Sequence, residues 1–212
     1  RPGESRRALV RHQGLGFSVV REGRPLVSLC MIVRDEETRL ERAIRSALPL
    51  VDEVVVVDTG SQDNTMDLAR RLGARVYSIP WEKDFSKARN ASLDRARGRY
   101  ALVLDADEEL VLPAEDRELI RQLLRANGAP DVLLARVVSP LGSGRGAREE
   151  LVSPRLLRND GTIRYRYPAH NQLTIGGKVQ APSRIRIIHH GYSDGAVLRR
   201  KLQRTLDILQ GM

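Results

Sequence analysis

Between residues 27 and 138 the sequence alternates short runs rich in β-branched residues with segments of helical periodicity. This alternation is typical of βαβ units, in which helices cover both faces of a mostly parallel sheet. With 212 residues, of which 41% are hydrophobic, the chain is long enough to bury one full core around such a sheet. The pattern predicts strands at 27–33, 54–57, 75–79, 100–104 and 132–138, and helices within 40–48, 61–73, 84–98 and 113–126.

Several residues mark where these helices begin and end. Asp84 is suited to cap a helix, and Pro113 is favoured at a helix start. Gly73 and Gly98 are typical of the residue that follows a helix. The run 54–57 consists of four valines, which is expected where helices cover both faces of a strand.

After Glu149 the alternation stops. Strand-like pieces near Leu151, Ile163 and Ile185 predict an antiparallel or irregular lobe that completes the sheet. The stretch 141–147 is rich in glycine and predicts a flexible loop. Residues 1–26 show no periodicity and are interpreted as a basic linker or arm, whereas 194–212 contain an amphipathic helix from about 194 to 210.

Charge is distributed unevenly along the chain. The net charge is +9, made up of +4 in residues 1–26, −3 in 27–139 and +8 in 140–212. The basic last third is compatible with an anionic ligand or acceptor, although a general arginine bias of the source proteome would give the same composition. Only eight aromatic residues are present and no RNA- or DNA-binding motif occurs, so nucleic acid is not an expected partner.

Cysteine content and hydropathy exclude other classes. Cys30 is the only cysteine, which rules out an intrachain disulfide framework and a cysteine-rich zinc site. No uncharged apolar run approaches 18 residues, and residues 1–7 lack the apolar run of a signal peptide. We therefore expect no transmembrane segment and a cytoplasmic location.

Acidic residues follow three of the predicted strands directly. Asp35 and Glu36 come after the first strand, Asp58 after the second, and Asp105 and Asp107 after the fourth. The carboxyl ends of parallel strands meet at one edge of a sheet, where ligands bind. Clustered carboxylates need compensation by donors or a cation, so this edge predicts a site for Mg²⁺ or Mn²⁺. An isolated Asp-x-Asp triplet is common by chance, and its position after a strand is what makes it informative.

Structural alternatives exist for several of these residues. Asp58 begins an Asp-Thr-Gly-Ser stretch, which is also good turn chemistry. Arg89 lies at the edge of the inward stripe of its helix and could instead be solvated. Asp35 and Glu36 could simply favour the N-terminus of the next helix.

Four stretches together resemble family 2 glycosyltransferases of the GT-A fold: 28–36, 54–65, 85–90 and 98–108. Their joint order and spacing carry the resemblance, which is strong over 27–110 and weaker to about 192. It implies an α/β fold with a Rossmann-like, mostly parallel central sheet flanked by helices and a smaller antiparallel C-terminal lobe. It also implies a glycosyltransferase domain at 27–193, with a nucleotide-binding half at 27–112 and an acceptor half at 113–193.

The resemblance assigns roles to individual residues. It implies that Asp58 accepts a hydrogen bond from the base and that the backbone after Val33 helps to form the base pocket. Arg89 would face the diphosphate, Asp105 the ribose or the metal, and Asp107 the metal. The remaining donor-binding positions of these stretches are Asp35, Glu36 and Ala106. The implied reaction is inverting transfer from a nucleotide-sugar, with UDP as the expected nucleotide, to a glycan, lipid or protein acceptor. Nothing in the sequence predicts the oligomeric state.

The segment 185–192 resembles the family stretch in which a histidine completes the metal shell. Strand alternation places His189 on one face with Ile185 and Ile187, and His190 on the other. At most one of the two histidines is therefore expected to be a ligand, and the register favours His189.

The stretch 168–173 resembles a region where related enzymes often carry His-Glu, the glutamate being a candidate general base. Here the sequence reads His170-Asn171, and an amide does not accept a proton usefully at neutral pH. His170, Glu149, Glu150 or Asp194 could take the role, or the acceptor could be delivered differently. The substitution leaves open a second interpretation, that of a non-catalytic nucleotide-sugar binder or scaffold.

The apolar stripe of the last segment, 197–209, resembles the lead-in to the tetratricopeptide-type helices that follow this domain in some relatives. Its alternatives are packing on the main domain or in a dimer.

Overall fold

The computed structural model describes residues 24–140, 148–180 and 184–190, the short strands β1 (Val10–Arg11) and β2 (Phe17–Ser18), and the isolated residues Gln203 and Leu206. The helices are α1 (Leu40–Ala47), α2 (Thr65–Arg71), α3 (Phe85–Arg95) and α4 (Ala114–Arg125). The strands of the main sheet are β3 (Val27–Val33), β4 (Glu53–Asp58), β5 (Arg75–Ser78), β6 (Tyr100–Val103), β7 (Glu108–Val111), β8 (Val132–Pro140), β9 (Arg148–Arg158), β12 (Val179–Gln180) and β13 (Arg186–His189). A separate hairpin contains β10 (Arg164–Arg166) and β11 (Gln172–Thr174).

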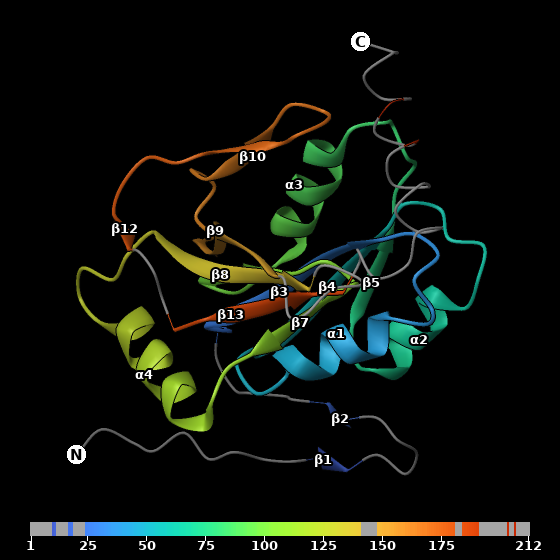
Figure 1. Ribbon diagram of the computed structural model, residues 1–212. Coiled ribbons are helices and arrows are strands. Elements are labelled where there is room, and N and C mark those ends of the chain that lie inside the picture. Colours follow the sequence, from blue (N-terminus) through green and yellow to red (C-terminus); the bar gives the residue numbers. More distant parts are fainter. Residues whose placement is uncertain are drawn as a thin grey trace.

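The main sheet has nine strands in the order β5-β4-β3-β6-β9-β8-β13-β7, with β12 also paired to β8. Figure 1 shows α3 and β10 on one side of the sheet, and α1, α2 and α4 on the other. Strands β5, β4, β3 and β6 are mutually parallel, so their carboxyl ends point to the same edge. This arrangement confirms the predicted α/β fold.

Each face of the sheet has its own hydrophobic core. The larger core packs α1, α2 and α4 against the sheet, with Leu29, Ile44 and Leu124 among its buried residues. The smaller core lies under α3 and the hairpin, and contains Leu93 and Tyr165. Successive side chains of a strand point to opposite faces, which is why the central parallel strands β3, β4 and β6 carry mostly apolar residues on both faces.

The second half of the sheet contains the antiparallel pairing that the loss of the βα rhythm predicts, and also two parallel pairings, of β13 and of β12 with β8. Strand β9 lies between β6 and β8 and is antiparallel to both. Strand β7, which follows the acidic triplet, was not predicted; it is antiparallel to β13. Its four residues are too short a run to give a clear period-2 signal.

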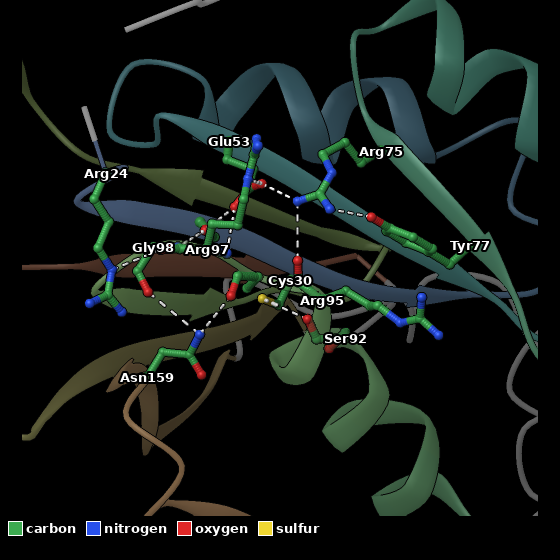
Figure 2. A network of polar contacts seen from close by, with 12 residues as sticks. Arg24, Cys30, Glu53, Arg75, Tyr77, Ser92, Arg95, Arg97, Gly98 and Asn159 are labelled. Carbon is green, nitrogen blue, oxygen red and sulfur yellow. Dashed lines mark hydrogen bonds and ion pairs between the residues drawn. The ribbon is translucent and has the colours of Figure 1, made fainter. Parts of the chain in front are cut away.

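The amino-terminal edge of the parallel strands is held by Glu53, whose side chain is buried (Figure 2). Glu53 accepts hydrogen bonds from the Ser28 hydroxyl at 2.6 Å, from the backbone N–H of Arg97 at 2.9 Å and its Nε at 2.8 Å, and from Arg75. Gly98 is required beside this cluster, because a Cβ there would lie 2.5 Å from the Ser28 oxygen. Glu53 therefore fastens β3, β4, β5 and the end of α3 together, away from the edge where ligands are expected.

Cys30 lies in the same region. Its thiol is buried and points to the Ser92 carbonyl oxygen at 3.6 Å. Burial, together with the charge of Glu53, raises the pKa of the thiol far above its usual value. Cys30 is thus a packing residue, as expected for a thiol inside an apolar strand.

Two predicted segments lie outside the described residues, namely the loop 141–147 and nearly all of the helix 194–210. In the part of the chain that the structure describes, no helix is both long enough and apolar enough to cross a membrane.

Candidate functional site

A cavity lies at the carboxyl edge of the parallel strands. It is lined by the end of β3, the loop after β4, the segment before α3, the first turns of α3 and the turn after β6. The lining residues are Ile32, Val33, Arg34, Glu36, Thr59, Trp81, Phe85, Arg89, Asp105, Ala106 and Asp107. Six of the residues predicted from the sequence, on three different elements, are thereby brought to one cavity.

Asp58 and Asp35 are not among the lining residues. Both accept hydrogen bonds within the loops that shape the cavity. Asp58 is buried, and its carboxylate accepts hydrogen bonds from the backbone N–H groups of Gly60 and Ser61 and from the Ser61 hydroxyl. Asp35 has a positive φ of 54° and accepts from the backbone N–H of Gln62 at 2.7 Å. The turn chemistry considered as the alternative for Asp58 is thus present in the structure.

The loops after β3 and β4 are joined by further reciprocal bonds. The backbone N–H of Glu36 donates to the Thr65 hydroxyl at 2.8 Å, and Glu37 accepts from the amide of Asn64 at 2.9 Å. These bonds fix the backbone that follows Val33. The side chain of Glu36 pairs with Arg39 at 3.1 Å on the same loop.

Arg89 forms an ion pair with Asp105 across the cavity. Its Nη2 lies 2.9 Å and 3.2 Å from the two carboxylate oxygens, and its guanidinium lies over the Tyr165 ring, 5.5 Å from the centroid. Arg89 is the more buried partner, with 15% of its side chain exposed against 35% for Asp105. Arg89 is therefore not the solvated helix residue that was the alternative from sequence.

The charges in this pair stabilise each other. Partial burial acts to raise the pKa of Asp105, but Arg89 and, more distantly, Arg155 outweigh it and hold the pKa below its usual value. Burial acts to lower the pKa of Arg89, but the Asp105 charge outweighs it. Both groups are therefore ionised. The Arg89 Nε is buried and has no hydrogen-bond partner among the described residues, so this guanidinium retains a free donor.

Asp107 meets His189, which comes from the far end of the sheet. The Asp107 Oδ2 lies 3.3 Å from the His189 Nε2; the Asp107 side chain is buried, and the His189 side chain is partly buried. His189 Nδ1 lies 3.4 Å from the Ser139 hydroxyl. His190 points elsewhere, its Nε2 lying 3.0 Å from Glu109 Oε2. The predicted alternation of the two histidines is what the structure shows.

Asp107 and His189 offer a carboxylate and an imidazole as ligands for a divalent ion. Within the described residues no group of three or more His, Cys, Asp or Glu side chains is arranged to hold a metal by itself. Mg²⁺ commonly uses only one or two protein carboxylates and takes its other ligands from water and substrate phosphate, and imidazole is acceptable to transition metals. The Asp107 carboxylate, which lines the cavity, and the adjacent His189 imidazole therefore fit an ion that is completed by a diphosphate.

Behind the cavity, Arg155 of β9 binds Glu108 with two parallel hydrogen bonds. Nη1 donates to Oε2 at 2.8 Å and Nη2 to Oε1 at 2.6 Å. Burial, and then the neighbouring Asp105 charge, raise the pKa of Glu108 despite this pairing. Neither residue was singled out from the sequence, because the pairing of β9 with β6 that brings Arg155 here is long-range.

His170 and Asn171 lie on the loop before β11 and are not among the residues that line the cavity. The loop is tied to α3, because the Phe85 backbone N–H donates to the Pro168 carbonyl at 3.0 Å. His170 has a positive φ of 50° and is exposed. The Asn171 amide nitrogen is buried and has no hydrogen-bond partner among the described residues.

The sequence also did not identify two aromatic lining residues, Trp81 and Phe85, as part of the site. Their rings are in edge-to-face contact with centroids 4.9 Å apart. Trp81 precedes the helix in a segment without periodicity, so the only available signal was that it is the single tryptophan of the chain.

A mixed sheet with an acidic turn at the carboxyl edge of its parallel half is the architecture of GT-A glycosyltransferases. The crystal structure of S. aureus TarS 1-349 has the same fold: it superposes with a TM-score of 0.57 at 18% identity, covering 84% of this chain and 65% of that one. The complex of the same fragment with UDP-GlcNAc gives a TM-score of 0.56 at 18% identity, covering 78% and 59%.

The family model described as "Glycosyl transferase family 2" matches residues 28–206, and the chain belongs to this family. A TPR repeat-containing protein of Synechococcus elongatus is 43% identical over 144 residues, which are 68% of this chain and 34% of that protein. An uncharacterized glycosyltransferase of Rickettsia typhi is 37% identical over 95 residues, which are 42% of this chain and 30% of that protein. The chain spans about a third of the length of these curated relatives.

Proposed function

We propose that this domain transfers a sugar, with inversion, from a nucleotide-sugar to an acceptor nucleophile, assisted by Mg²⁺ or Mn²⁺. The observation that carries the proposal is that Arg89, Asp105 and Asp107 line one cavity at the carboxyl edge of the sheet, with His189 in contact with Asp107. Family membership supports the same reaction class.

Arg89 has the properties that a leaving nucleoside diphosphate requires. Negative charge develops on the diphosphate oxygens as the glycosidic bond breaks, and a fixed guanidinium stabilises it without reorganisation. Arg89 is held by Asp105 and Tyr165 and retains an unpaired Nε–H donor among the described residues. A divalent ion held by Asp107 and His189 would supply the remaining positive charge at the diphosphate.

The base and ribose would lie against the backbone that follows Val33. Asp35 and Asp58 support this backbone through their loop bonds, and Glu36, Ala106 and Asp105 line the cavity beside it. We propose that Asp58 acts on the nucleotide mainly by holding this loop, while a direct bond to the base would use the remaining lone pairs of its carboxylate. TarS was crystallised with UDP-GlcNAc, so UDP-linked sugars are the first donors to test.

The acceptor is proposed to be a glycan, lipid or protein, with anionic character matched to the basic last third of the chain. Asn171 does not serve as a general base, and His170 is the neighbouring group that could do so. The presence of Asn171 where a general base might be expected is the observation that favours the second candidate function, a nucleotide-sugar binder or scaffold without transfer activity.

The deciding experiment is a screen of nucleotide-sugars for release of the nucleoside diphosphate, with and without Mn²⁺. An enzyme releases the diphosphate slowly even without acceptor, whereas a binder shows heat in calorimetry but no release. Asp107→Ala should lower the release by about 10²–10³. Asp67→Ala, which removes an exposed carboxylate on α2, is the matched control and should leave it unchanged. Wild-type release by Asp107→Ala, or the absence of any nucleotide binding, would refute the proposal.

A further inference from the structure

Two hydrogen bonds between Asp105 and Glu108 close the acidic turn after β6, residues 105–108. The Asp105 backbone N–H donates to Glu108 Oε2 at 2.9 Å, and the Glu108 backbone N–H donates to the Asp105 carbonyl at 3.0 Å. The Asp107 carbonyl in the middle of the turn accepts from the His190 backbone N–H at 2.8 Å. The conformation of the turn is therefore determined by contacts outside the cavity.

Within this turn the two aspartates diverge to different partners. Asp105 reaches Arg89 on α3, and Asp107 reaches His189 on β13. A rotation of the turn would disturb both pairs at once. The group that sets its rotation consequently sets the geometry of the whole acidic triplet.

Glu108 in turn depends on Arg155. The Glu108 side chain is 3% exposed and the Arg155 side chain 13%, and the two parallel bonds between them fix the position of the carboxylate. Removing one partner of such a buried pair leaves an uncompensated charge and is strongly destabilising. Without Arg155, the buried Glu108 carboxylate would lose the guanidinium that binds it.

We propose that Glu108 and Arg155 are positioning residues of the donor site, which hold the 105–108 turn so that Asp105 and Asp107 meet their separate partners. Neither residue is among those that line the cavity, so they act through the two aspartates. The expected effect on ligand binding rests on the proposed function, whereas the expected effect on the conformation of the turn does not. Outer partners of this kind affect metal affinity or activity by about 10- to 100-fold.

The test uses Glu108→Gln, which keeps an acceptor oxygen for the Asp105 N–H but loses the charge, and Arg155→Gln. The matched control is Arg158→Gln, because Arg158 lies on the same strand and pairs with Asp131, a carboxylate that is not among the lining residues. Titration calorimetry with Mn²⁺ and UDP should show about 10- to 100-fold weaker binding for the two test variants and wild-type binding for the control.

Two further readouts separate positioning from a general loss of folding. Hydrogen exchange at the Asp105 and Glu108 amides should accelerate in the test variants while the amides of β4 keep their protection. In donor hydrolysis, a higher Mn²⁺ concentration should restore the maximal rate of the test variants. A defect in metal affinity raises the half-saturating Mn²⁺ concentration, whereas an unfolded fraction of the protein lowers the maximal rate.

The outcomes are distinct. If wild-type protein binds UDP and Glu108→Gln binds it equally well with unchanged exchange, the positioning role is wrong. An equal defect in Arg158→Gln would also overturn it. If the wild type binds no UDP but exchange in the turn still accelerates, the proposed function fails and the role of Glu108 in the turn stands.

Discussion

The carboxylate of Asp107 lies 3.3 Å from the Nε2 of His189, although Asp107 is in the middle of the domain sequence and His189 is near its end. The contact depends on the antiparallel pairing of β7 with β13, in which His189 is directly opposite Glu108. A carboxylate that lines the cavity and an imidazole at this distance from it are suited to bind one ion together.

Replacing His189 by alanine should weaken Mn²⁺ binding and lower donor hydrolysis by about 10²–10³, because a group that stabilises the developing charge is lost. Isothermal calorimetry and diphosphate release measure the two effects. His190→Ala is the control on the adjacent position, since His190 points to Glu109. A larger effect from His190 than from His189 would show that the assignment is reversed.

Arg89→Lys should reduce diphosphate release by about 10²–10³ even though the positive charge is kept, because lysine cannot reproduce the planar guanidinium held between Asp105 and Tyr165. Arg95→Lys on the same helix is the control, as Arg95 lies over Tyr77 at the other end of α3. Wild-type release from Arg89→Lys would mean that a point charge is sufficient at this position.

Asp58→Ala should lower the free energy of unfolding by about 1–3 kcal/mol, because the backbone N–H groups of Gly60 and Ser61 lose the carboxylate that accepts their hydrogen bonds. Urea unfolding followed by circular dichroism measures this loss, and Asp67→Ala on the exposed face of α2 is the control. Unchanged stability combined with loss of UDP binding would contradict the loop-holding role and favour direct contact with the base.

Glu53 should make the fold sensitive to acid. Burial acts to raise the pKa of Glu53, but the hydrogen bonds from Ser28, Arg97 and Arg75 outweigh it and hold the pKa below its usual value. A lowered pKa in the folded state means that the stabilisation is present above the unfolded-state value and is lost as the pH falls through the folded-state value. The loss of stability should therefore begin near the ordinary glutamate pKa of 4.5 and grow below it.

The measurement is the urea midpoint of the wild type and of Glu53→Gln at pH 7 and at pH values below 4.5. Glu53→Gln should be less stable than the wild type at pH 7 by about 1–3 kcal/mol, and the difference should shrink in acid. Donor binding by the folded variant should stay unchanged, because Glu53 lies at the amino-terminal edge of the strands. If the difference in stability between the wild type and Glu53→Gln stayed constant across this pH range, the ionised Glu53 would be excluded as its source.

Much of this architecture follows from local sequence. Short-range chemistry specifies the strands through the apolar runs of β3, β4 and β6. It specifies the start of α3 through the side chain of Asp84, which accepts hydrogen bonds from the backbone N–H groups of Ser86 and Lys87. Once these strands are parallel, Asp105 and Asp107 must lie at the same edge as Val33. The placement of the acidic turn was predictable for this reason.

Other features were decided only by the tertiary structure. The insertion of β9 between β6 and β8 brings Arg155 to Glu108, and the return of β13 beside β7 brings His189 to Asp107. Such pairings depend on which strand edges remain free after the parallel core has formed, and no local pattern encodes them. The sequence by itself determined which residues end the parallel strands at the ligand edge, whereas the long-range pairing of β7, β9 and β13 decided which partners meet them, because strand register is selected by the packing of the whole sheet.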